Sequence, residues 1–152
     1  METSKTYEFH PIADCWSLIE GDEFKALVRD IKQRGVIEPI WLFEGKILDG
    51  RNRYRASLAA GVACPTREYT GDDPAGFAVS INDLRRHQTA SQRALAAARL
   101  ATLAQGARRD LKLSANVQKV SQNEAAQMLR VSVRAVASAK QILKSARLEI
   151  IE

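Results

Sequence analysis

The hydrophobic pattern of this chain changes once along its length, and that change limits what it can fold into. Up to about residue 70, short apolar runs alternate with glycine turns and amphipathic stretches, which is typical of a small mixed domain. From residue 77 onward every periodic segment has helical spacing. We therefore predict an α+β chain, with a small mixed-sheet domain at residues 1–88 and an all-helical domain at residues 89–152.

Turn and cap residues delimit the expected elements. Gly35 and Gly61 each follow an amphipathic run and are predicted to end a helix, and Glu44-Gly45 is predicted to join two short strands. The expected strands cover residues 40–43, 46–48 and 66–69, and the expected helices cover residues 23–34, 51–60, 78–84, 91–105, 123–130 and 133–149.

The net charge of +5 is divided unevenly along the chain. Residues 1–89 carry 12 basic and 14 acidic side chains, a net of −2, whereas residues 90–152 carry 11 and 4, a net of +7. Basicity confined to the helical half indicates a polyanionic partner, most often nucleic acid. A solvated helix surface rich in arginine and lysine is the alternative.

Several classes of protein are excluded by composition. No apolar run approaches the roughly 18 residues that span a bilayer, and the first residues lack the apolar stretch of a signal peptide. Cys15 and Cys64 are isolated, so they predict neither a zinc site nor a disulfide framework. We therefore expect a cytoplasmic protein without a membrane partner or a structural metal.

The stretch at residues 47–57 (ILDGRNRYRAS) is the most informative part of the first half. An apolar strand runs into Asp49-Gly50, and a helix carrying Arg51, Arg53 and Arg55 begins at once. Glycine permits a sharp turn, the first N–H groups of a helix attract anions, and arginine suits phosphate oxygens. The pattern indicates a phosphate-binding turn. The alternative is a surface helix start whose arginines pair with nearby acids: Asp49, Glu44 or Glu68.

A second polar cluster lies at residues 80–93 (SINDLRRHQTASQR). Asn82 and Arg85 are three residues apart, so they lie on one helix face and are predicted to converge on the same anion as the glycine turn. The alternative is an ordinary helix end, with Thr89 or Ser91 capping the next helix.

Residues 121–144 have the layout of a helix-turn-helix. Ser121 and Glu124 form a capping-box pattern, and Arg130-Val131-Ser132 is the expected turn. In the second helix we expect four residues to face inward: Val133, Val136, Ile142 and Leu143. The residues expected to meet DNA are Ser132, Arg134, Ser138, Lys140, Gln141 and Lys144. A plain helical hairpin in a bundle is the alternative.

Three segments in this order resemble the ParB/sulfiredoxin superfamily, specifically ParB-like proteins in which a ParB-like nuclease domain precedes a helix-turn-helix. Residues 35–40 (GVIEPI) resemble the family's GV-x-QPI segment, residues 50–56 (GRNRYRA) its G-E-R-R-x-R-A box, and residues 81–85 (INDLR) its E-N-x-x-R box. The resemblance covers about residues 10–144. It implies a nucleotide or phosphate site made by Glu38, Gly50, Arg51, Asn52, Arg53, Arg55, Asn82, Arg85 and Arg86.

The resemblance also implies CTP with Mg²⁺ as a ligand, but three positions depart from the family pattern. Arg51 and Asn52 stand where the family has Glu and Arg, and Ile81 replaces the Glu that opens the third box. Isoleucine cannot ligate magnesium, so we expect NTP hydrolysis to be slow or absent and assign no catalytic residue. The sulfiredoxin branch carries G-C-H-R at this turn; Arg51 occupies the cysteine position, which excludes a reductase.

The leading hypothesis is a DNA-binding protein similar to ParB, acting in plasmid partition or in regulation of a mobile element. The family resemblance implies a homodimer, double-stranded DNA and a partition ATPase as partners, and a bacterial cytoplasm in which the protein is bound to the nucleoid or a plasmid. The alternatives are a ParB-like nuclease, a CTP hydrolase, or an adaptor for an acidic protein surface. Hydrolysis needs clustered carboxylates, and only Asp49 and Asp83 lie near the boxes.

Overall fold

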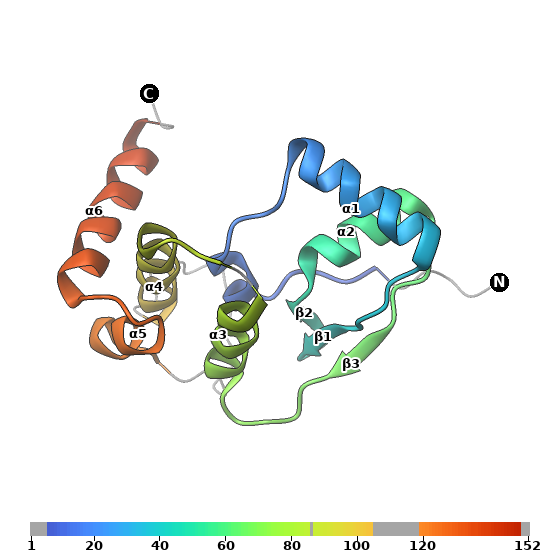
Figure 1. Cartoon of the computed structure of the whole chain (residues 1–152). Helices are drawn as coiled ribbons and strands as arrows, with labels where there is room; N and C mark the ends of the chain where they lie inside the picture. The colour runs from blue at the N-terminus through green and yellow to red at the C-terminus, as the bar shows by residue number, and fades with distance from the viewer. Residues whose placement is uncertain (1–5, 86, 105–118, 150–152) are drawn as a thin grey trace. The chain divides into compact units, whose positions relative to one another are not determined.

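The computed structural model describes residues 6–85, 87–104 and 119–149, and these divide into two compact units, Met1–Pro74 and Ala75–Glu152 (Figure 1). The first unit holds a small mixed sheet with helices, and the described part of the second unit is helical. The α+β class expected from the sequence is therefore observed. The helix that begins at Pro74 groups with the second unit, whereas the change in sequence pattern suggested a boundary near residue 88.

The sheet of the first unit contains three short strands in the order β2-β1-β3. Strand β1 (Ile40–Phe43) pairs antiparallel with β2 (Lys46–Asp49) and parallel with β3 (Thr66–Glu68). Glu44 and Gly45 both have positive φ, 53° and 75°, as a two-residue hairpin turn requires. All three expected strands are present, within one residue at their ends.

Two helices and a short 3-10 turn complete this unit. Helix α1 (Gly21–Arg34) packs against α2 (Arg51–Ala60), and Figure 1 shows the two lying alongside one another. They end at Gly35 and Gly61, as expected. The 3-10 turn η1 (Pro11–Cys15) was not anticipated, because its few residues show no periodicity.

The N-terminal segment extends the sheet beyond β2. Phe9 forms a parallel bridge with Ile47, and backbone hydrogen bonds join Ile47 to Glu8 and His10 at 2.8 and 2.9 Å. Tyr54 of α2 is buried with the sheet residues Ile40, Leu42 and Ile47, and this cluster is covered in part by Tyr7, Phe9 and Cys64. The start of the chain therefore belongs to the core of the first unit.

The second unit contains four described helices: α3 (Pro74–Arg85), α4 (Ala90–Ala104), α5 (Gln122–Met128) and α6 (Val133–Glu149). Helix α4 packs against both α5 and α6. Its alanines Ala94, Ala97, Ala98 and Ala101 are buried, which lets helix backbones approach closely. Each helix agrees with expectation to within four residues at its ends, and α6 agrees at both ends.

Gly50, between β2 and α2, is the glycine that the first unit requires most. It has φ +100°, and a Cβ built there would lie 2.6 Å from Cγ2 of Ile40. Gly45 has φ +75°, but no atom of the described residues lies within 4 Å of its Cβ position. A side chain would therefore be strained at either position, but it would overlap a neighbouring atom only at position 50.

We expect Gly50→Ala to lower the free energy of unfolding by about 3 kcal/mol or more, because left-handed strain and overpacking add. The matched control Gly45→Ala should cost about 1–2 kcal/mol, from strain alone. Urea unfolding of the full chain measures both values. Equal losses in the two variants would show that the contact with Ile40 does not restrict this turn.

Candidate functional site

The predicted phosphate-binding turn is a strand-to-helix connection in the first unit. Gly50 is the N-cap of α2 in the left-handed conformation, and its carbonyl accepts the first helical hydrogen bond, from Tyr54 N at 2.9 Å. No side chain in the described part of the chain caps the helix. The local geometry is the one that the sequence indicated, so the partners of the arginines decide its role.

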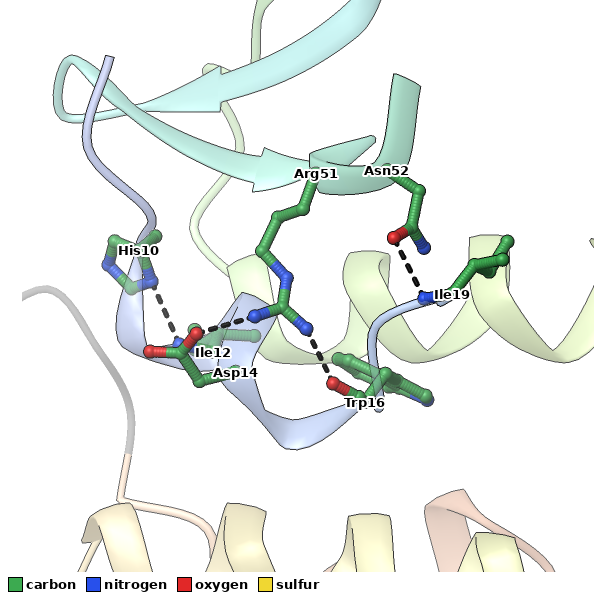
Figure 2. A network of polar contacts seen from close by, with 7 residues as sticks. All are labelled: His10, Ile12, Asp14, Trp16, Ile19, Arg51 and Asn52. Carbon is green, nitrogen blue, oxygen red and sulfur yellow. Dashed lines mark hydrogen bonds and ion pairs between the residues drawn. The ribbon is translucent and has the colours of Figure 1, made fainter. Parts of the chain in front are cut away.

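Arg51 is buried, and its guanidinium is engaged by the N-terminal segment. Nη1 donates to the Asp14 carboxylate at 2.6 Å, and Nη2 donates to the carbonyl of Trp16 (Figure 2). The guanidinium also lies 5.5 Å from the centre of the Phe9 ring. Only 9% of the Arg51 side chain is exposed, so this cation depends on internal partners.

Asn52 and Arg55 bind the same N-terminal segment at Ile19. Asn52 Oδ1 accepts a hydrogen bond from Ile19 N at 3.0 Å, and Arg55 donates to the Ile19 carbonyl at 3.2 Å. The Arg55 guanidinium stacks over the Phe24 ring at 4.5 Å, which joins α2 to α1. The chain between η1 and α1 is thus fastened to the first turns of α2.

The partners of Arg53 lie just before β1 and at the end of β2. Its Nη2 donates to Asp49 at 3.2 Å and to the Pro39 carbonyl at 3.3 Å, and Nη1 lies 3.8 Å from the Glu38 carboxylate. The pairing of Arg53 with Asp49 matches the alternative kept open in the sequence analysis. Since Arg51 and Arg53 both satisfy internal acceptors, the contacts favour a structural role, and nucleotide or phosphate binding here stays a prediction.

The third box lies on α3 and therefore in the second unit. Asn82 is buried and donates to the Ala78 carbonyl at 2.8 Å, and Asp83 lies 3.9 Å from Arg130. Arg86 and the side chain of Arg85 lie outside the described residues. Because the second and third boxes belong to different units, the shared anion site predicted from the sequence stays a prediction.

Helix α5, the first helix of the predicted helix-turn-helix, begins with the capping box that the sequence indicated. Glu124 N donates to Ser121 Oγ at 3.2 Å, and Ser121 N donates to Glu124 Oε2 at 2.7 Å. Hydrogen bonds from the backbone N–H of Ser121 and from its side-chain hydroxyl lower the pKa of the Glu124 carboxyl. The start of α5 is therefore confirmed as predicted.

The turn between α5 and α6 is closed by its backbone. Arg130 is left-handed at φ 51°, and Arg130 N and Val131 N donate to the carbonyls of Gln127 and Ala126 at 3.2 and 3.0 Å. Ser132 then caps α6, accepting from Ala135 N at 3.1 Å. Arginine thus adopts the conformation for which glycine is preferred in such turns.

The packing between α5 and α6 corrects one expectation. Ala125, Ala126, Leu129 and Val136 are buried, but Val133 is 44% and Ile142 is 62% exposed, so these two do not face inward as we predicted. The helical period explains the difference, because Val136 and Ala139 define the buried direction and place Val133 and Ile142 on opposite flanks. Leu143 is half-buried.

The outer face of α6 carries the side chains predicted to meet DNA. Five of them are exposed and Lys140 is half-buried; the exposed ones are Ser132, Arg134, Ser138, Gln141 and Lys144. Arg147, further along the same helix, is also exposed. Within the described residues, several polar and basic side chains of this helix are therefore exposed.

No protein-family model matches the chain, and the search of curated proteins found no match either. In the part of the chain that the structure describes, no helix is long and apolar enough to cross a bilayer, and no group of three His, Cys, Asp or Glu residues could hold a metal ion.

His10 and Asp14 are residues that the sequence analysis did not single out. His10 is buried at the start of η1, where Nδ1 accepts a hydrogen bond from Ile12 N at 3.2 Å (Figure 2). Burial lowers the pKa of His10, although Glu44 and Asp14 oppose this shift and Lys46 adds to it. A buried neutral imidazole therefore caps η1, the turn that contains Asp14, the partner of Arg51.

We expect Arg51→Ala to lower the free energy of unfolding of the ligand-free protein by about 2–3 kcal/mol, because it removes a buried guanidinium and its acceptors lose a donor. Urea unfolding measures this loss. The control Arg34→Ala removes an exposed arginine paired with Asp30 at 3.3 Å and should cost less than about 0.5 kcal/mol. Unchanged stability of Arg51→Ala would argue for a ligand-binding role instead.

We expect the protein to lose stability as the pH falls below about 6.5, where the unfolded chain binds a proton that folded His10 disfavours. Above that pH the contribution is fully present. His10→Asn should flatten this dependence while keeping a capping acceptor. Thermal unfolding across this range checks both proteins, and His87→Asn, which leaves His10 in place, should behave as wild type.

Proposed function

We propose that this protein binds double-stranded DNA by placing α6 in the major groove. The observation that carries the proposal is the pairing of a closed α5–α6 turn with an exposed outer face that presents Arg134, Ser138, Gln141 and Lys144. A major groove accepts a helix of this kind, and its donors and acceptors suit arginine, glutamine and serine.

Charge supports the same partner. Residues 90–152 carry a net charge of +7, and Arg134, Lys144 and Arg147 are exposed on one helix. Lysine and arginine at a DNA surface displace condensed counterions, which makes binding strong at low salt and weaker at high salt. A plain helical hairpin in a bundle would not need a basic outer face.

We further propose that the protein acts as ParB-like proteins do, in plasmid partition or in regulation of a mobile element, as a homodimer and with a partition ATPase as partner. The order of the three boxes before a helix-turn-helix supports this role. The mixed sheet of the first unit and the helices of the second are compatible with it.

Nucleotide binding by the first unit has weaker support. Asp49 is paired with Arg53 and Asp83 with Arg130, while Arg51 is held by Asp14. No contact of the described residues favours the nuclease or CTP hydrolase over the DNA-binding protein. Binding of CTP measured with and without Mg²⁺ is the direct test of this part of the proposal.

We expect the double variant Arg134→Ala with Lys144→Ala to bind random-sequence duplex DNA more weakly and to reduce the slope of log K against log salt by about 2. Fluorescence anisotropy over a salt series measures both. The control Lys25→Ala with Lys32→Ala removes the same charge from α1 and should leave the slope unchanged. Duplex binding by the α6 variant with wild-type affinity and slope would contradict the proposal.

A further inference from the structure

An apolar strip runs from one flank of α6 onto its outer face, among polar side chains. Val133, the first residue of the helix, is 44% exposed, and Ala137, four residues later, is also exposed. Residues at this spacing are neighbours on a helix surface, about 5–6 Å apart between their Cβ atoms. Val133 and Ala137 thus form one continuous small patch.

The strip lies where a recognition helix reads bases. The N-terminal residues of such a helix contact base edges, and Val133 and Ala137 both belong to the first two turns of α6. Arg134 is the next residue along the chain, and Ser138 follows Ala137, so polar side chains border the strip. The small size of Ala137 and Ser138 lets the helix backbone approach the groove floor.

The charges around the strip favour a nucleic-acid partner over a second protein chain. Arg134 and Lys144 are exposed on the same outer face, and this half of the protein carries a net charge of +7. Among the groups that the major groove presents, the apolar one is the C5-methyl of thymine. The apolar strip suits the methyl groups of thymine, and the basic side chains beside it suit the phosphates on either side of the groove.

We propose that Val133 and Ala137 contact the C5-methyl groups of thymines, so that the preferred DNA contains thymine at the positions that the start of α6 reads. This inference rests on the proposed DNA binding and adds the base that the site selects. Arg134, beside the strip, supplies the polar and electrostatic contact.

The test uses the full chain and duplex DNA that it selects itself. Duplexes enriched from a random pool by the wild-type protein are resynthesised with uracil in place of every thymine, which removes the methyl groups and keeps the base pairs. We expect wild-type affinity to fall about three- to fourfold for each contacted methyl that is lost. Equal affinity for the two DNAs would overturn the inference while leaving DNA binding intact.

A variant separates direct contact from any effect of the methyl groups on DNA shape. Val133→Ala improves helix propensity, so the fold is retained. It should prefer thymine over uracil duplexes less strongly than wild type does, because Ala137 is then the main remaining contact with the methyl groups. The control Ile142→Ala removes an exposed side chain from the opposite flank, where it lines a groove of about 520 Å³ with α4, and should keep the wild-type preference.

Two other outcomes would count against the inference. A thymine preference as large in Val133→Ala as in wild type would overturn the assignment to this side chain, because an effect of DNA shape does not depend on Val133. Failure of the wild-type protein to enrich any duplex would overturn the proposed function, and the inference with it. The first outcome leaves binding measurable and the second does not, so the two failures are distinguishable.

Discussion

The buried guanidinium of Arg51 is the interaction on which the first unit depends. A cation with 9% of its side chain exposed must be paired, and its partners are the Asp14 carboxylate and the Trp16 carbonyl. These two groups come from a segment that precedes Arg51 by more than thirty residues. The segment therefore has to pass the start of α2, which places the remaining contacts at Ile19 and, through Arg55, at Phe24.

The turn from β2 through Gly50 into α2 could either bind a phosphate or hold other parts of the chain, because its local geometry is the same for both roles. Gly50 adopts the left-handed cap in either case, and the arginines suit a phosphate as well as a carboxylate or a carbonyl. In this protein Arg51, Arg53 and Arg55 all have acceptors within their own unit. The turn thus ties the chain together, and the proposed function rests mainly on the helix-turn-helix.

The pair of helices α5 and α6 and the turn between them are specified by local contacts. Ser121 and Glu124 close the start of α5, Ser132 caps α6, and Arg130 takes the left-handed position between them. Each of these contacts spans only a few residues. On the outer face of α6, Arg134, Ser138, Gln141 and Lys144 are exposed in the described part of the chain, so they can meet a partner.

The sequence by itself determined the elements whose signals are local: the three strands, the helix ends at Gly35 and Gly61, and the capped α5–α6 turn. Only the tertiary structure decided the partners of Arg51, the burial of His10, and the exposure of Val133 and Ile142. Asp14 and Arg51 are 37 residues apart, and no spacing rule links residues so distant. Periodicity places a residue on a helix face, but the neighbouring elements decide which face is buried, and that choice depends on packing across the whole unit.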